Sequence, residues 1–238
     1  MSSSAVQLVL LPGLGADARL FADLRRRGVS FDTPAWLAPK PGESLRGWVA
    51  RWVRERPDDF GQAGRPRVLG GMSFGGQVAL EAARLLEPES VALISSHPCS
   101  DELTPRFRRQ VGKLRWIPDL ALRFGLRRIG MPAIARREQL QKDQRKTLLA
   151  MADTAPLSFF RWACQAAADW QWPHNGDENA TALRSQVHRI HGSEDSVIPL
   201  GERDERTTVL AGAGHLIPMT HTEDVATWLE SQCRIAAS

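Results

Sequence analysis

The sequence predicts a single α/β domain with a mostly parallel central sheet, helices on both faces and one inserted helical segment. Short apolar runs alternate with amphipathic segments, a glycine-rich turn around a serine joins one such pair, and the alternation stops between residues 98 and 180. Alternating strands and helices are typical of parallel sheets that are covered on both faces. A length of 238 residues and an apolar fraction of 42% are enough for one large core.

The first half of the chain shows the alternation most clearly. Residues 6–11 have a buried-strand pattern that leads directly into a proline-glycine turn. Asp17 and Ser44 each precede an amphipathic segment, and both are residue types that cap helices. We expect a helix after each cap, with a strand over 29–31 between them. Later strands are expected near 66–70, 90–95, 186–191 and 207–210.

The most informative motif is Gly-Gly-Met-Ser-Phe-Gly-Gly at 70–76. It stands between an apolar strand pattern and a helical segment, 77–86, whose apolar residues repeat at helical spacing until Pro88 bars continuation. A bare G-x-S-x-G also occurs by chance in glycine-rich loops, so the flanking elements decide its meaning. A strand before it and a helix after it favour a nucleophile elbow.

In such an elbow the serine adopts strained backbone angles that only small neighbours tolerate. Gly71 and Gly75 are those neighbours, and Ser73 would project its hydroxyl above the sheet. The Phe74 N–H and the N-terminus of the following helix would face the place where an oxyanion forms. The turn is therefore suited to acyl transfer.

A serine hydroxyl is a weak nucleophile and needs a base held in the right tautomer by a carboxylate. Asp195 and His215 each lie in a loop just beyond a predicted strand, and the carboxyl ends of parallel strands meet at one edge of the sheet. For the acid, Glu194 is the nearest rival and Asp177 a more distant one. Only His215 follows a strand through a glycine-rich loop. The competing histidines are His97, His174, His188, His191 and His221.

A second oxyanion donor is expected from the turn at 12–15, which follows the first strand. The Leu14 N–H would pair with the Phe74 N–H, and removal of one such donor typically costs about 2.7 to 4 kcal/mol of transition-state stabilisation. The alternative interpretation is an ordinary tight turn.

Elbow, acid loop and histidine loop, in the order Ser73, Asp195, His215, resemble the α/β-hydrolase fold superfamily across nearly the whole chain. The resemblance implies a Ser-His-Asp triad on that fold. The chain departs from typical members in two respects. It has Pro12 where many have histidine in the first glycine loop, and we expect its first strand to begin at Val6, which would leave no room for the leading antiparallel strands of many members.

Residues 98–180 are expected to form a helical cap, inserted in a core made of 1–97 and 181–238. Between residues 106 and 146 there are 13 Lys/Arg and three Asp/Glu, so this segment carries +10. The remainder carries −6, and the two together give the formal charge of +4. A local cationic field can gather an acidic partner, and the alternative is a solvated helical face.

The short length, the Leu14 loop and the basic cap are loosely similar to pimeloyl-acyl carrier protein methyl ester esterases and related small carboxylesterases and thioesterases. This resemblance implies that the cap receives an acidic acyl carrier protein. The candidate docking residues are Arg123, Arg127, Arg128, Arg136 and Arg137. Cap aromatics could line an acyl pocket, or belong to the core. The candidate pocket residues are Phe159, Phe160 and Trp162.

These observations predict a serine hydrolase that cleaves a carboxylic ester or thioester through an acyl-enzyme, without a metal or organic cofactor. The same triad supports lyase, perhydrolase or acyl-transfer and cyclisation chemistry, which motifs do not separate from hydrolysis. A non-catalytic ligand receptor is a further alternative. A nucleic-acid binder is the weakest one, because no recognised nucleic-acid motif accompanies the basic segment.

The ends and the cysteines predict the setting. The N-terminus lacks the charged and apolar regions of a signal peptide, and no apolar run approaches the ~20 residues of a membrane span. We therefore expect a cytoplasmic protein without a membrane span. Cys99, Cys164 and Cys233 are widely spaced and odd in number, which favours ordinary thiols over disulfides or a zinc site.

Overall fold

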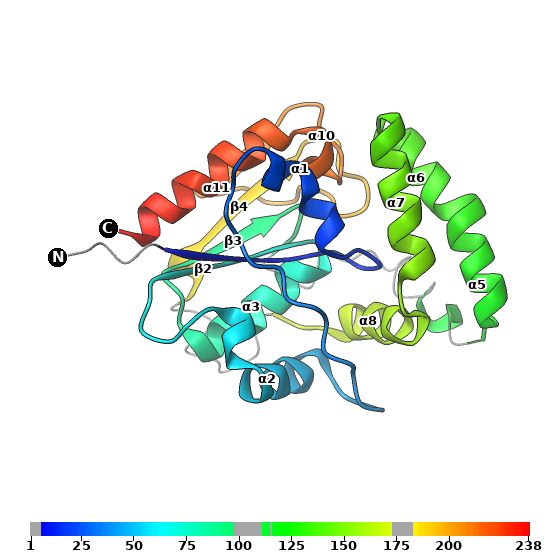
Figure 1. The fold of residues 1–238 in the computed structure, drawn as a ribbon, viewed down its shortest axis with the longest axis horizontal. Helices are drawn as coiled ribbons and strands as arrows, with labels where there is room; N and C mark the ends of the chain where they lie inside the picture. Colours follow the sequence, from blue (N-terminus) through cyan, green and yellow to red (C-terminus); the bar gives the residue numbers. More distant parts are fainter. Residues whose placement is uncertain (1–5, 98–110, 115, 173–182) are drawn as a thin grey trace.

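A five-stranded parallel sheet lies at the centre of the chain, in the order β1-β2-β3-β4-β5 (Figure 1). The computed structural model describes residues 6–97, 111–114, 116–172 and 183–238. The strands are β1 (Gln7–Leu11), β2 (Arg67–Met72), β3 (Ser90–Ile94), β4 (Val187–Gly192) and β5 (Thr207–Leu210). In register, the paired residues include Gln7 with Arg67, Val68 with Ser90, Val91 with Val187 and Arg189 with Thr207. The parallel sheet and its strands are as predicted.

The order of the strands reverses next to β1. After β1 the chain passes to one side, where Asp32 pairs with Val9 in a single parallel bridge, and then crosses to β2 on the other side. The strand expected over 29–31 is thus reduced to this bridge, because Pro34 follows closely and has no N–H to extend a ladder. In open α/β sheets, such a reversal places a ligand crevice at the carboxyl ends of the neighbouring strands. The carboxyl end of β1 leads into the turn at 12–15, and the carboxyl end of β2 leads into the glycine-rich serine turn.

Helices cover both faces of the sheet. On one face α1 (Ala22–Arg26) and α11 (Thr222–Ala236) bury their apolar sides, and on the other face α2 (Leu45–Glu55) and α3 (Phe74–Leu86) do so (Figure 1). The helix α3 begins three residues earlier than the apolar spacing indicated, because it starts directly after Ser73.

Both predicted caps are present. The Asp17 side chain accepts the Arg19 N–H, and the Ser44 side chain accepts the Gly47 N–H. The segment after Asp17 begins with one 3₁₀ turn, Ala18–Phe21, before α1. The segment after Ser44 is α2.

Between β3 and β4 the chain forms a helical cap at one end of the molecule (Figure 1). Its described helices are α5 (Asp119–Gly125), α6 (Met131–Arg137), α7 (Lys142–Thr154) and α8 (Leu157–Asp169), with a π-helical turn, Leu126–Gly130, between α5 and α6. Apolar residues of α6 and α7 join the cluster beneath α11, and those of α8 join the cluster beneath α2 and α3. The cap is therefore packed onto both layers. The limits predicted for it, 98 and 180, lie outside the described residues.

Two of the three cysteines are described, and both are free thiols: Cys164 is buried and Cys233 half-buried. Burial raises the pKa of the Cys164 thiol to about 12. Cys99 lies outside the described residues. None of the described helices has the length and apolar character needed to cross a membrane.

Candidate functional site

Ser73 joins β2 to α3 with φ 54° and ψ −120°, and a positive φ of this kind is rare for non-glycine residues. A Cβ atom at Gly71 would overlap the Gly75 carbonyl, and one at Gly75 would overlap the Leu11 carbonyl. The turn is therefore as tight as backbone contact allows, and only glycine fits on either side of the serine. The Ser73 N–H donates to Ile94 O at 3.0 Å, which ties the turn to the end of β3.

The carbonyl of Ser73 is held by a residue that the sequence did not single out. Ser96 Oγ donates to Ser73 O at 2.8 Å, and a Cβ at Gly76 would overlap the Ser96 side chain. A hydroxyl residue just beyond the strand next to the elbow is the signal that could have indicated this contact. The second glycine of the Gly75-Gly76 pair is thus explained by close approach of β3.

The glycine turn after β1 lies directly against the elbow. A Cβ placed on Gly13 would be 3.5 Å from the Ser73 Cβ. Phe74 is the first residue of α3, and the N–H groups of a first helical turn have no acceptor within the helix. The turn that contains Leu14 and the start of α3 therefore both border Ser73.

The two other residues of the predicted triad are in direct contact. His215 Nδ1 is 2.7 Å from Asp195 Oδ2, and Asp195 Oδ1 accepts the N–H groups of Val197 and Ile198, each at 2.9 Å. Asp195 follows β4 and His215 follows β5, so both lie at the edge of the sheet where Ser73 ends β2. Among the described residues, no hydrogen bond joins His215 to the Ser73 hydroxyl. Catalytic hydrogen bonds are often longer in unliganded enzymes.

A second histidine stands behind the acid. His191 is wholly buried, and its Nε2 is 2.8 Å from Ile198 O and 3.3 Å from Asp195 Oδ2. Because a carbonyl only accepts, Nε2 carries the proton, and that proton also faces the carboxylate. Burial raises the pKa of the Asp195 carboxyl, but hydrogen bonds from His191 and His215 outweigh it and hold this pKa well below its usual range. The Asp195 carboxyl is therefore ionised at neutral pH.

Two further buried side chains hold the loop after Asp195. Arg189 Nη1 donates to His97 Nδ1 at 2.8 Å, and His97 Nε2 donates to Pro199 O at 2.5 Å. Arg189 Nη2 donates to Leu200 O at 3.1 Å and to Glu202 O at 2.7 Å. Burial lowers the pKa of His97 to about 4, and the charge of Arg189 acts in the same direction. His97 is thus a neutral link between a buried cation and the loop.

Among the described residues, the remaining rivals for the base and the acid form no hydrogen bond with Ser73, Asp195 or His215. His188 is half-buried on β4, and His221 Nδ1 is 2.9 Å from Thr220 Oγ1. Glu194 is exposed and lines a cavity, described below. His174 and Asp177 lie outside the described residues.

The aromatic residues predicted for the pocket surround the elbow. Phe159 and Trp162 have ring centroids 6.5 Å and 6.4 Å from that of Phe74. A Cβ on Gly15 would be 3.5 Å from the Phe160 ring. Phe159 is buried, whereas Phe160 and Trp162 are half-buried. All three therefore pack against the elbow or the glycine turn, and two keep accessible surface.

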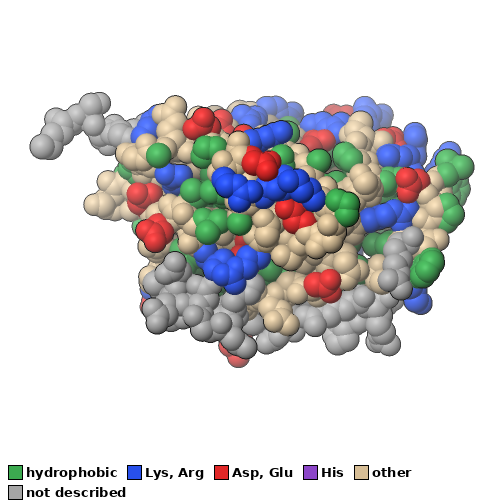
Figure 2. Space-filling view, turned by 90° about the horizontal axis from the view of Figure 1, so that it is seen from below, with side chains coloured by type: hydrophobic (Ala, Val, Ile, Leu, Met, Phe, Trp, Pro, Cys, Tyr) green, Lys and Arg blue, Asp and Glu red, His purple; other side chains and the backbone are tan. Residues whose placement is uncertain are grey.

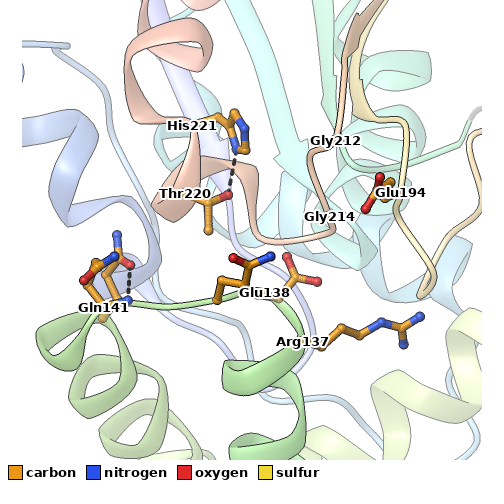
Figure 3. Close-up of a pocket in the computed structure, with 10 residues that line it drawn as sticks. Arg137, Glu138, Gln141, Glu194, Gly212, Gly214, Thr220 and His221 are labelled. Carbon is orange, nitrogen blue, oxygen red and sulfur yellow. Dashed lines mark hydrogen bonds between the residues drawn. The ribbon is translucent and has the colours of Figure 1, made fainter.

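Two cavities adjoin this region. One of about 500 Å³ lies between the cap and the loops that carry Asp195 and His215 (Figure 3). Another of about 690 Å³ lies between Trp162 and the start of α2. Neither cavity is lined by Ser73. Across the described parts of the chain, no group of three or more His, Cys, Asp or Glu is arranged to hold a metal ion.

The five arginines predicted for docking differ in their surroundings. The Arg123 guanidinium donates to Ala152 O at 3.3 Å, to Ala155 O at 3.2 Å and to Asp153 O, at the end of α7. Arg127 is 3.4 Å from the Asp153 carboxylate and keeps 59% of its side chain exposed. The exposed ones besides Arg127 are Arg128, Arg136 and Arg137. In the view of Figure 2, Lys and Arg side chains are interspersed with acidic and apolar ones.

Solved structures with this fold cover almost the whole chain. A thermophilic esterase from Thermogutta terrifontis has 18% identity and a TM-score of 0.68, over 99% of this chain and 92% of its own. One from a study of carboxylesterases of Nitrososphaera gargenis has 16% identity and a TM-score of 0.69 over the same shares. MenH from S. aureus has 12% identity and a TM-score of 0.70, over 100% of this chain and 96% of its own.

Sequence comparison identifies the family directly. No curated protein sequence matches the chain. The sequence profile of the alpha/beta hydrolase family, however, matches residues 8–228, which include the elbow, the acid loop and the histidine loop. The chain belongs to the alpha/beta hydrolase family.

Proposed function

We propose that this protein is a serine hydrolase that cleaves a carboxylic ester or thioester through Ser73, His215 and Asp195. One arrangement carries the proposal: a serine held at φ 54° at the same sheet edge as a buried histidine–carboxylate bond of 2.7 Å. Stability of the fold does not explain either feature, because a strained backbone and a buried charge both cost free energy of folding. Together they match the needs of an activated nucleophile.

The roles follow from the chemistry of each group. Because Asp195 accepts a hydrogen bond from Nδ1–H, His215 presents an unprotonated Nε2 and takes the Ser73 proton as Oγ attacks the carbonyl carbon. The Leu14 and Phe74 N–H groups bind the oxyanion. The proton on Nε2 then passes to the departing alcohol or thiol, which leaves an acyl-enzyme. Water, deprotonated by the same imidazole, releases the carboxylic acid and restores Ser73.

The acyl group would lie along the aromatic residues that border the elbow. Phe159, Phe160 and Trp162 supply apolar surface beside the glycine turn and Phe74. Neighbours described as esterases favour an ester, and the thioester remains the second substrate class of the same mechanism.

We further propose an acidic acyl carrier protein as the partner of the cap. Arg127 and Arg128 are exposed, and Leu120 and Phe124 nearby keep 83% and 61% of their surface exposed. Cations beside apolar side chains suit an acidic partner that delivers an acyl chain. We leave Arg123 out of the proposed docking surface because its guanidinium donates to carbonyls at the end of α7.

Charge reversal tests the partner separately from catalysis. Arg127→Glu with Arg128→Glu should lower kcat/KM for a carrier-bound ester by about tenfold or more and leave a free p-nitrophenyl ester unaffected, because exposed charges mainly set encounter rates. Equal turnover of the carrier-bound ester would refute docking on this face.

Intact mass after treatment with a fluorophosphonate tests the catalytic proposal. The native chain should gain one adduct, and Ser73→Ala and His215→Ala should gain none. His221→Ala is the matched control, since among the described residues the imidazole of His221 bonds only to Thr220, and this variant should label as the native chain does. A native chain that gains no adduct would contradict an activated Ser73.

A further inference from the structure

The loop that carries His215 is contacted by one carboxylate of the cap. Glu138 directly follows α6, and its Oε2 accepts the Leu216 N–H at 2.9 Å. Glu138 is buried, with only 8% of its surface exposed. Leu216 is the residue immediately after the histidine. A residue of the cap, 78 positions away in sequence, therefore bonds to the backbone beside the proposed base.

The residue on the other side of the histidine contacts the same carboxylate. A Cβ on Gly214 would lie 2.5 Å from Glu138 Oε2, 2.7 Å from Oε1 and 2.8 Å from Cδ. These are the three nearest atoms, and Gly214 is not among the residues with positive φ. Glycine is required here by space rather than by backbone angles. Figure 3 shows Glu138 directed from the cap toward the Gly214 turn.

The surroundings of Glu138 favour a role as a hydrogen-bond acceptor. Among the described residues it forms no ion pair, and it borders the polar cavity of about 500 Å³. The charged or titratable side chains that line this cavity with it are Arg137, Glu194 and His221. A second bond joins cap and core at this cavity, from Gln144 Nε2 to Met219 O at 2.5 Å, but it contacts α10 (Ile217–Thr220) rather than the histidine loop.

We infer that Glu138 is a positioning residue. It accepts a hydrogen bond from the Leu216 N–H and packs against Gly214, so the placement of His215 depends on the placement of the cap. This inference rests on the proposed function of His215. The imidazole is fixed at Nδ1 by Asp195, and the Glu138 contact fixes the backbone from which the imidazole projects. A displacement of about 1 Å at a catalytic group can cost 10²-fold in rate. The cap thereby contributes to catalysis without contacting the reacting atoms.

Three variants separate the bond from general attachment of the cap. Glu138→Ala removes the acceptor and should lower kcat for a p-nitrophenyl ester by about 10- to 100-fold with little change in KM. Glu138→Gln keeps an oxygen for the Leu216 N–H and should retain kcat within about threefold. Gln144→Ala breaks the other cap–core bond beside this cavity and should leave kcat nearly unchanged. The inference would be overturned if Gln144→Ala lost as much kcat as Glu138→Ala does. It would also be overturned if Glu138→Gln lost as much kcat as Glu138→Ala does.

Gly214 provides a test that does not depend on removing the carboxylate. In the native background Gly214→Ala should lower kcat as Glu138→Ala does, because its Cβ displaces the carboxylate. In the Glu138→Ala background the same substitution should add almost nothing, since the atoms it meets are gone. Additive losses of kcat would show that Gly214 serves another purpose. They would overturn the inference that Gly214 and Glu138 act through one contact.

An activity-independent measurement separates failure of this inference from failure of the proposed function. Hydrogen exchange of the Leu216 amide, followed by NMR, should accelerate by about tenfold or more in Glu138→Ala and not in Gln144→Ala, because one buried hydrogen bond has been lost. Unchanged exchange would overturn the contact even in an active enzyme. Faster exchange in a chain that no fluorophosphonate labels would support the contact and reject the hydrolase proposal. If Glu138→Ala does not fold, Glu138→Asp is used in its place, because the shorter side chain withdraws the same oxygen from the Leu216 N–H.

Discussion

The two parts of the candidate site are held in place by different forces. At the elbow, backbone lies against backbone: the carbonyls of Leu11 and Gly75 occupy the space where side chains of Gly75 and Gly71 would be. At the acid and histidine loops, side chains from distant segments bond to main-chain groups, as His97 and Glu138 do. The first arrangement is steric and insensitive to pH. The second depends on charge, protonation and the placement of the cap.

Asp195→Asn removes the charge on which the second arrangement depends. We expect kcat to fall by about 10³- to 10⁴-fold, because an amide does not hold His215 in the productive tautomer. Steady-state turnover of a p-nitrophenyl ester measures it. Glu194→Gln is the matched control, since this neighbouring carboxylate is exposed, and its kcat should be unchanged. A large loss in the control alone would assign the acid to Glu194.

Gly75→Ala tests the steric arrangement. The added Cβ overlaps the Leu11 carbonyl, so we expect a loss of about 3 kcal/mol or more in the free energy of unfolding. Urea denaturation followed by circular dichroism measures it. Gly125→Ala is the control: its Cβ meets nothing within 4 Å and it lies in α5, so stability should be equal or slightly higher. Similar stability of the two variants would mean that the elbow relaxes easily.

Acid should weaken the second arrangement through His97. Its pKa in the folded protein is lowered from 6.5 to about 4, so the unfolded chain binds more protons between these values. The stabilisation is fully present above pH 6.5 and is lost as the pH falls toward 4, by up to about 3 kcal/mol.

Urea unfolding at several pH values between 7 and 4 measures this slope. His97→Gln should flatten it, though not entirely, because burial also lowers the pKa of His188. An undiminished slope in His97→Gln would mean that other groups cause the pH dependence.

His191 should have the smallest effect of the four. His191→Leu removes one of the hydrogen bonds that the Asp195 carboxylate accepts while the two backbone donors remain, so kcat should fall by about tenfold. KM should stay constant, because His191 is wholly buried. His191→Gln can place an amide N–H near the same acceptors and should recover most of the loss. An equal loss in both variants would indicate a packing role.

The sequence predicted the local elements and the meeting of Asp195 with His215, and it missed other contacts between distant segments. The serine turn between strand and helix, the caps at Asp17 and Ser44 and the positions of the strands along the chain depend on neighbouring residues, and all are present in the fold. The strand at 29–31 was expected from apolar residues alone, and the ladder instead reduces to one bridge ahead of Pro34.

No periodicity or motif indicates the polar contacts that hold the acid and histidine loops. Glu138 stood in a segment notable only for its basic charge, and Arg189 resembled any polar residue of a strand. Their partners are main-chain groups, which carry no residue identity, so spacing alone does not reveal such pairs. Gly214 is the exception, because its absent side chain indicates that something else occupies that space.

Under the proposed mechanism, Phe74 links substrate preference to rate. Its ring packs against Phe159 and Trp162, while its N–H, at the first position of α3, is a proposed oxyanion donor. A substitution that reshapes the acyl pocket at this residue also shifts the donor, so the two properties do not vary independently there. Laboratory evolution toward larger acyl groups would therefore succeed sooner at Trp162, whose backbone lies in α8, away from the developing charge.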